Sequence, residues 1–479
     1  MRKSLLFIFI LLPLAVPATS SLPRFWAIAA ALSPQAASDD NLAAARRSDA
    51  TIRDSQGKLG RLTAFEHLRR ANIYLTNRAF AEAREHWEAV LKFYPQDAGV
   101  PEALLGIGRS YFQDRRYDEA FVFFDRVARE SPGTKEGREG LNFSAAAALR
   151  MGRFNEAVER YRGYIEKYPV GERFDTAHLN LIDTLREADR SSEAIQWITR
   201  TREKFAGKPT ETNAVFGRLR LDVADGNWTH AISTATELSA MRFQKGVQTT
   251  ATEVAYLKGY SQEQDGRTDE AIRTYLTIPD GVDAYYGWLA TRRLAHLAAG
   301  KDQTQRNTRV ASQVAGSARL YPAPYRGALV GAARTRQLDP RFILAIIKQE
   351  SVFKPFAKSP SGARGLLQLT MDAALKYAGN AGFSALRENQ LYRPETSILV
   401  GSQYLEELFR LFPNQPEAVA ASYNGGEDNV ARWLRRAKQN DPGVFTAEIG
   451  FDETKDYVQK VMTNYRAYQQ LYNADLTPR

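Results

Sequence analysis

Small residues recur at a fixed period along the N-terminal part of the chain. An alanine that follows an acidic or polar residue returns every 37 residues over five occurrences, and once more after 40. These alanines are Ala83, Ala120, Ala157, Ala194, Ala231 and Ala271. Pro95, Pro132 and Pro169 keep the same register, each lying 12 residues beyond its alanine. Because such periods are the signature of stacked structural units, the pattern predicts a helical-repeat solenoid over residues 60–300.

The repeat around Ala120 resembles the tetratricopeptide pattern. The matching positions are Leu104, Gly108, Tyr111, Phe124 and Pro132. Trp87, Phe124 and Tyr161 fill one aromatic position in three successive repeats, and the match weakens after Ala194. The resemblance implies paired helices that approach closely at the small residue, with the aromatic packed in the next layer. We interpret these aromatics as packing residues. A surface for protein partners is also expected of such repeats, but the spacing does not reveal what it binds.

The remaining segments divide the chain further. Residues 301–318 are polar and poorly periodic, which predicts a linker before a compact, mainly helical domain over residues 319–479. At the N-terminus, Arg2 and Lys3 precede a short apolar run and then small residues, a pattern typical of a signal peptide over residues 1–18. An uncleaved anchor remains the alternative, although the run is about half the length that spans a bilayer. Residues 19–59 stay unassigned.

Composition narrows the chemistry. The net charge is +10, yet no block of Lys and Arg and no recognition motif favours a nucleic acid. A basic exported protein near an acidic wall polymer or a membrane surface fits the charge, but membrane association is not expected. The chain has no cysteine, hence no lipid-attachment cysteine, and all five histidines precede residue 300. Ser-His-Asp catalysis, Cys-His catalysis and histidine zinc sites are therefore excluded from the C-terminal domain.

One carboxyl group in that domain lies in an unusual setting. Asp339 and Pro340 form a good helix start, which predicts a helix from that point. One face of this helix carries Ile343, Ile346, Ile347 and Glu350. Burial and the helix C-terminus both raise a carboxyl pKa, which suits a general acid. On periodicity alone, a buried glutamate paired with a neighbouring Arg or Lys remains the alternative.

The sequence from Glu350 onward resembles the lytic transglycosylase domain of soluble murein transglycosylases, which are relatives of goose-type lysozyme. The matches occur in family order within this domain of about 160 residues. They are Glu350, Ser351, Phe353, Pro355, Ser359, Gly365, Leu366, Leu367, Gln368, Gly401, Tyr404, Leu405, Tyr423, Asn424, Gly426, Glu453, Thr454, Tyr457, Val458 and Val461. Departures at Leu367, Thr370, Met371, Ser422 and the run 426–428 leave Glu350 in place but bear on how sugars flank the cleavage point. The resemblance implies a mainly helical, lysozyme-like catalytic domain behind the solenoid.

The resemblance also implies a reaction. Glu350 would protonate the glycosidic oxygen between N-acetylmuramic acid and N-acetylglucosamine in peptidoglycan glycan strands, and then act as the base. The substrate's acetamido group and its 6-hydroxyl replace a second catalytic carboxylate, and no cofactor or metal is needed. The implied substrate-binding residues are Ser351, Ser359, Gln368, Tyr423, Asn424, Glu453 and Tyr457. We interpret Glu388, Glu395, Glu427 and Asp428 as solvated charges.

Two other functions stay open at this point. The same site could act as a muramidase that gives water to the intermediate. Alternatively, the chain could be a scaffold whose C-terminal domain binds the wall without cleaving it. Whichever holds, the export signal and the substrate class predict a periplasmic location.

Overall fold

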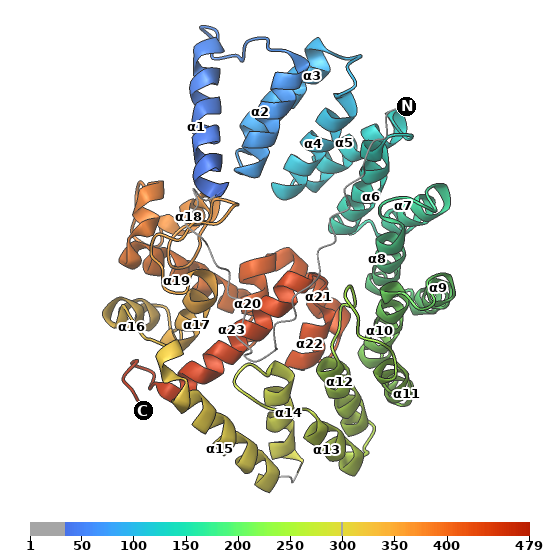
Figure 1. Cartoon of the computed structure of the whole chain (residues 1–479), viewed down its shortest axis with the longest axis vertical. Coiled ribbons are helices and arrows are strands. Elements are labelled where there is room, and N and C mark those ends of the chain that lie inside the picture. Colours follow the sequence, from blue (N-terminus) through green and yellow to red (C-terminus); the bar gives the residue numbers. More distant parts are fainter. Residues whose placement is uncertain (1–33, 298–299) are drawn as a thin grey trace, which may run out of the picture.

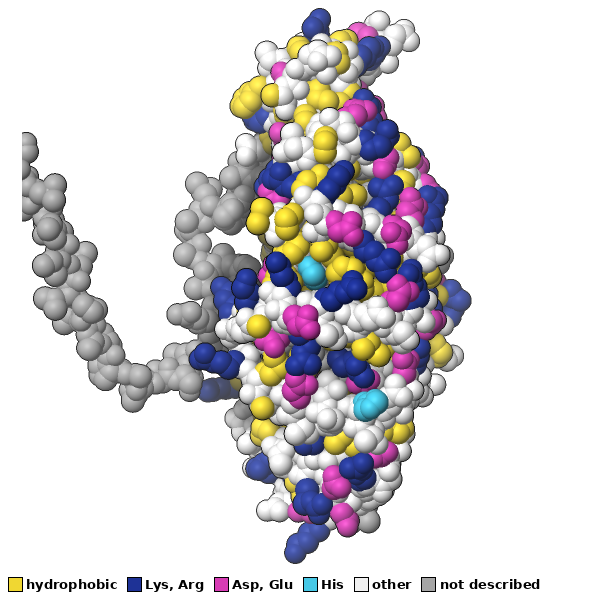
Figure 2. Space-filling model, turned by 90° about the vertical axis from the view of Figure 1, so that its right-hand side faces the viewer, with side chains coloured by type: hydrophobic (Ala, Val, Ile, Leu, Met, Phe, Trp, Pro, Cys, Tyr) yellow, Lys and Arg dark blue, Asp and Glu magenta, His cyan; other side chains and the backbone are white. Residues whose placement is uncertain are grey.

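The computed structural model describes residues 34–297 and 300–479, and most of these residues form helices joined by turns and loops (Figure 1). The predicted signal peptide lies outside the described residues. Helix α1 (Pro34–Ile52) occupies part of the segment that the sequence left unassigned. No helix in the described ranges is long and apolar enough to cross a membrane. Lys and Arg alternate with Asp and Glu over the face seen in Figure 2, so the positive charge forms no single-signed patch there.

The helical-repeat solenoid that the period predicts is present. Its helices are α2 (Ala64–Thr76), α3 (Phe80–Phe93), α4 (Val100–Gln113), α5 (Tyr117–Glu130), α6 (Lys135–Arg150), α7 (Phe154–Lys167), α8 (Phe174–Glu187), α9 (Ser191–Lys204), α10 (Pro209–Ala224), α11 (Trp228–Ser239), α12 (Ala251–Gln264), α13 (Thr268–Thr277) and α14 (Tyr285–His296). Consecutive helices pack as antiparallel pairs that follow an arc (Figure 1).

The periodic small residues lie where neighbouring helices meet. All six repeat alanines are fully buried, and so are the aromatic side chains of Trp87, Phe124 and Tyr161. A Cβ atom on Gly108 would stand 2.6 Å from the ring of Phe124, so glycine is needed for the helices to approach this closely. The interpretation of the aromatics as packing residues is confirmed.

The turn inside each repeat has one residue in the left-handed region, five positions before the repeat alanine. These residues are Arg78, Arg115, Gly152, Asp189, Gly226 and Gly266. The turn is a helix C-cap in which, for example, the Arg116 amide donates to the carbonyl of Tyr111 across 2.9 Å. Glycine adopts this conformation freely, whereas another residue pays of order 1 kcal/mol or more. Three of the six turns carry a charged side chain despite that cost.

The connection between the two parts is itself folded. The residues expected to form a linker lie mostly in α15 (Gly300–Gly316), which packs on α14 through the buried side chains of Val310 and Val314. The polar composition that suggested a linker reflects the exposed sides of this helix. The exact domain boundary stays a prediction.

The C-terminal part is a compact group of helices. It contains η1 (Ala318–Leu320), α16 (Arg326–Thr335), α17 (Pro340–Ser351), α18 (Met371–Ala378), η2 (Glu388–Tyr392), α19 (Pro394–Leu411), α20 (Pro416–Gly425), α21 (Glu427–Ala437), α22 (Pro442–Glu448) and α23 (Asp452–Leu471). Helix α23 packs on both α17 and α20, and helices α20 to α23 lie inside the arc of the repeats (Figure 1).

Buried ion pairs join the two parts. Arg186 on α8 and Arg220 on α10 both bond to Glu448 at the end of α22, and all three side chains are almost completely buried. Further along, Arg466 of α23 forms a bidentate pair with Asp280 at 2.7 and 3.0 Å. Because a buried charge is costly without its partner, these pairs fix how the repeats and the C-terminal helices fit together.

Candidate active site

Helix α17 carries Glu350 in its last turn, as the sequence predicts. The helix starts at Pro340, and the Asp339 side chain caps it by accepting a hydrogen bond from the Arg341 amide at 2.9 Å. The three isoleucines of the predicted apolar face are fully buried. The chain leaves the helix through two left-handed residues, Val352 and Phe353. Glu350 is therefore held at the edge of a core, partly buried but still in contact with solvent.

The carboxyl group of Glu350 has an elevated pKa. Burial raises this pKa from its ordinary value of 4.5 to about 7, and the negative charge of Glu453 acts in the same direction. A hydrogen bond from the hydroxyl of Tyr457 to Oε1, at 2.7 Å, opposes the shift. Among the residues that the structure describes, no Lys or Arg pairs with this carboxyl. The alternative of a buried structural ion pair is therefore wrong, and Glu350 holds its proton over much of the acidic and neutral range.

Two tyrosines flank Glu350 in their neutral form. Burial raises the pKa of both Tyr423 and Tyr457 well above the ordinary range, and the nearby charge of Glu350 adds to the shift. The hydroxyl of Tyr423 donates to the carbonyl of Leu367 at 2.6 Å, which ties α20 to the loop after α17. Helices α17, α20 and α23 thus each supply one side chain to the same place.

Asn424 follows Tyr423 at the solvent-exposed end of α20. Its Oδ1 accepts a hydrogen bond of 2.6 Å from the hydroxyl of Thr454 on α23. This bond fixes which way the carboxamide faces and leaves its two N–H groups as donors for a ligand. Glu453, the residue before Thr454, is exposed beside it. Both predicted residues therefore lie near Glu350 in positions that a substrate can reach.

Gln368 and Ser359 shape the loop that follows α17. Gln368 has a left-handed backbone, and its Nε2 donates to the carbonyls of Ala357 and Gly365 at 3.0 and 2.9 Å. The Oγ of Ser359 accepts a hydrogen bond from the Ala363 amide. A Cβ atom at Gly365 would meet the Leu391 carbonyl at 2.0 Å, so the loop requires glycine there. The substrate contacts of Gln368 and Ser359 stay a prediction.

Ser351 is the least accessible of the predicted binding residues. Its side chain is buried, and its Oγ donates to the Ile347 carbonyl one helical turn earlier. The structure thus gives this residue a role in the end of α17, and its contact with a substrate also stays a prediction.

One residue near the site was misread from the sequence. Glu427, interpreted as a solvated charge, is partly buried and forms a bidentate ion pair with Arg115 at 3.0 and 3.1 Å. That interpretation is wrong, whereas Glu388, Glu395 and Asp428 are exposed as expected. Sequence reasoning also assigned no role to Arg115 or to Thr454. The position of Arg115 in the 37-residue register is the signal that could have found it.

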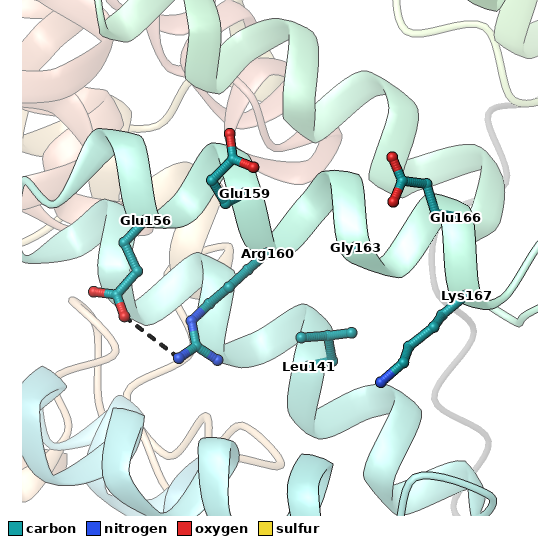
Figure 3. A pocket seen from close by; sticks show the side chains of 7 residues that line it. All are labelled: Leu141, Glu156, Glu159, Arg160, Gly163, Glu166 and Lys167. Atoms are coloured by element: carbon teal, nitrogen blue, oxygen red, sulfur yellow. Dashed lines mark hydrogen bonds and ion pairs between the residues drawn. The ribbon is translucent and has the colours of Figure 1, made fainter.

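A pocket lies in the repeats. It has a volume of about 580 Å³, and its lining residues come from α6 and α7 (Figure 3). They are Leu141, Glu156, Glu159, Arg160, Gly163, Glu166 and Lys167. The ion pair of 3.3 Å between Arg160 and Glu156 crosses part of it. None of the residues around Glu350 takes part in this pocket.

Comparisons with known proteins agree with this arrangement. Residues 329–445 match the family model described as Transglycosylase SLT domain, and residues 68–134 and 144–209 match Tetratricopeptide repeat. The soluble lytic murein transglycosylase of Escherichia coli K12 is 33% identical over 159 residues, which cover 32% of this chain and 24% of that protein. A Haemophilus influenzae protein named with the same words is 36% identical over 155 residues, which cover 32% of this chain and 26% of that protein. The matched region thus spans about a quarter of the length of either relative.

A solved structure has the same fold over most of the chain. An inactive mutant of the lytic transglycosylase Slt from Pseudomonas aeruginosa superposes with a TM-score of 0.51 at 17% sequence identity. The superposition covers 92% of this chain and 87% of that one. The architecture of helical repeats around a mainly helical, lysozyme-like domain is therefore shared beyond the region of sequence similarity.

Proposed function

We propose that this chain, in which a transglycosylase SLT domain follows tetratricopeptide repeats, is a lytic transglycosylase that cleaves the glycan strands of peptidoglycan. The bond cleaved is the β-1,4 bond between N-acetylmuramic acid and N-acetylglucosamine. The observation that carries the proposal is Glu350 itself. Its pKa of about 7 and its bond to a neutral tyrosine suit the role of a general acid, and it lies within the matched domain, which supports the proposal.

In the first step, the protonated Glu350 gives its proton to the glycosidic oxygen. The C1–O bond of the N-acetylmuramic acid residue breaks, and N-acetylglucosamine leaves with a free hydroxyl group. The positive charge that develops at C1 is met by the substrate's own acetamido group. Tyr457 stabilises the carboxylate that Glu350 becomes, because its hydroxyl donates to Oε1.

In the second step, the Glu350 carboxylate removes the proton of the 6-hydroxyl of the same muramic acid. That oxygen attacks C1 and closes a 1,6-anhydro ring, and the proton taken from the 6-hydroxyl leaves Glu350 in its acid form again. One carboxyl group serves both steps, so this route differs from glycosidase mechanisms that use two carboxylates. Asn424 and Gln368 are proposed to hold the sugars on either side of the bond, with Tyr423 and Glu453 close to them.

Location and partners follow from the substrate. Peptidoglycan lies in the cell envelope, and the signal-like pattern over residues 1–18 supports export to the periplasm. The repeats add a surface for protein partners of the wall-building or wall-degrading machinery. The intermixed charges on the face in Figure 2 are compatible with both roles.

The test is digestion of purified peptidoglycan followed by mass analysis of the products. The wild type should release 1,6-anhydro ends, and Glu350→Gln should release none. Glu395→Gln is the matched control, since it removes an exposed carboxylate of the same domain. Products one water molecule heavier would identify a muramidase instead. Full activity of Glu350→Gln would show that the catalytic acid is another residue.

A further inference from the structure

Helix α21 lies along the turns of four consecutive repeats. The contacts come from the turns between α4 and α5, α6 and α7, α8 and α9, and α10 and α11. These turns share the 37-residue register, so they form one continuous edge of the array. We call this the turn edge, and its contacting residues are Arg115, Arg150, Glu187, Asp189 and Asp225.

The N-terminal end of α21 is held by Arg115. Its guanidinium group forms a bidentate pair with Glu427, at 3.0 and 3.1 Å, and lies 3.4 Å from Asp428. In the next turn, Arg150 donates a hydrogen bond to the side chain of Asn429. A bidentate Arg–carboxylate pair fixes orientation as well as distance.

Ion pairs with the repeats also hold the rest of α21. Arg432 forms a bidentate pair with the buried Glu187, at 2.6 and 2.7 Å. At the C-terminal end, the ammonium group of Lys438 lies 3.0 Å from both Asp189 and Asp225. Basic residues of the array thus face the acidic start of α21, and acidic residues of the array face its basic end.

The turn residues themselves indicate that these contacts matter. Arg115 and Asp189 adopt the left-handed conformation that Gly152 and Gly226 supply in the neighbouring repeats. Glycine would fit the same turn with less strain, but it could not reach α21. The ion pairs with α21 and its C-cap therefore best explain why Arg115 and Asp189 stand where glycine would be less strained.

The N-terminal end of α21 lies next to the candidate active site. Gly426 is both the C-cap of α20 and the N-cap of α21, so the chain turns a corner there. Tyr423 and Asn424 lie directly before this α20–α21 corner. A Cβ atom on Gly426 would stand 3.1 Å from the Arg115 guanidinium, which shows how closely the arginine packs on that corner. The side chain of Arg115 therefore reaches, through Glu427, the residues beside Glu350.

We propose that the turn edge positions the α20–α21 corner for binding of the glycan strand, and that Arg115 is a positioning residue of the active site. The inference rests on the proposed function. It extends that function by giving the repeats a part in the site itself, in addition to any partner binding. Without Arg115, the corner and Asn424 would be less well fixed, and substrate affinity would fall while the acid chemistry of Glu350 persists.

The experiment compares Arg115→Gly with Arg78→Gly in the full chain. Both residues occupy the left-handed position of their turn, so both substitutions relieve the same strain. Arg78 lies over the ring of Phe80 and makes a long ion pair with Asp372, at 4.0 Å, so it contacts neither α20 nor α21 and serves as the matched control. On soluble, uncrosslinked glycan strands, Arg115→Gly should raise KM about fivefold and leave kcat within about twofold. Arg78→Gly should leave both constants unchanged, and Arg115→Lys should recover part of the loss because it restores the charge.

Amide hydrogen exchange over residues 424–428 gives a second readout, independent of turnover. Exchange should be faster in Arg115→Gly and unchanged in Arg78→Gly. Equal KM values and equal exchange in the two variants would overturn the inference. If the wild type releases reducing ends, the proposed function fails. The ratio of the KM values of Arg115→Gly and Arg78→Gly still tests this inference in that case. If the wild type cleaves no glycan, the proposed function fails and the exchange data decide.

Discussion

The hydroxyl of Tyr457 lies 2.7 Å from Oε1 of Glu350 and donates a hydrogen bond to it, although the two residues are 107 positions apart in the chain. This bond joins the last turn of α17 to the first turns of α23. It stabilises the ionised carboxyl, whereas burial and the charge of Glu453 favour the protonated one. The balance of these effects leaves the pKa of Glu350 at about 7, where the group can both give and take a proton.

Tyr457→Phe tests that balance, because it removes the hydroxyl and keeps the ring. Without the hydrogen bond, the pKa of Glu350 should rise further, so the alkaline fall in kcat/KM should move up by about one pH unit. The rate should also drop by about tenfold, since the carboxylate formed in the first step loses its donor. Tyr465→Phe is the control, because it removes a similar bond of 2.9 Å to Asp339 at the other end of α17. An alkaline limb that stays in place in Tyr457→Phe would contradict the assignment.

Glu350→Gln should stabilise the protein at alkaline pH. The pKa of Glu350 is about 7 in the folded chain and near 4.5 in the unfolded chain, so the folded state binds the proton more tightly. Stability due to this group is therefore present at low pH and is lost as the pH rises from about 5 to 8. Glutamine does not titrate, so the variant should gain at most about 3 kcal/mol over the wild type at high pH, and little at pH near 4. Urea unfolding of both proteins across this range measures the difference, and a gap that does not grow with pH would refute the raised pKa.

The local features of the fold could be read from the sequence because they depend on residues close in the chain. The 37-residue period predicts the repeats, and the buried alanines and Phe124 confirm its physical reason. The cap at Asp339 and the apolar spacing predict α17 and the place of Glu350 on it. In both cases, helix geometry converts spacing directly into a face.

The long-range contacts could not be read in this way. The family resemblance predicts Tyr457 as a substrate-binding residue, but its bond to Glu350 was not predicted, since no spacing rule relates two helices so far apart. The pair between Arg115 and Glu427 joins residues 312 positions apart, and it depends on how far the array curves. That curvature is the sum of small rotations between repeats, which side-chain packing sets at every interface. The charged residue in place of glycine at the turn was the one local sign of this contact.

Thr454→Val should weaken substrate binding through Asn424. Valine fills nearly the same volume but cannot donate the 2.6 Å hydrogen bond to Oδ1 of Asn424, so the carboxamide loses its fixed orientation. KM for glycan strands should rise about threefold to tenfold, with a small change in kcat. Thr463→Val is the control, because Thr463 is equally buried on α23 but bonds only to carbonyls of its own helix. Equal KM values for the two variants would argue against a role for Asn424.

Arg186→Met should unfold far more easily than the wild type. Arg186 and Glu448 are both almost fully buried where the repeats meet α22, so the substitution leaves a buried carboxylate with only part of its compensation from Arg220 and Arg436. Removing one partner of such a pair costs about 3–5 kcal/mol, whereas an exposed pair contributes at most about 1 kcal/mol. Arg126→Met provides the exposed comparison, since it breaks an i,i+4 pair with Glu130 on the surface of α5. The urea midpoint should fall sharply for Arg186→Met and hardly for Arg126→Met, and equal midpoints would show that the repeats and the C-terminal helices are joined by other contacts.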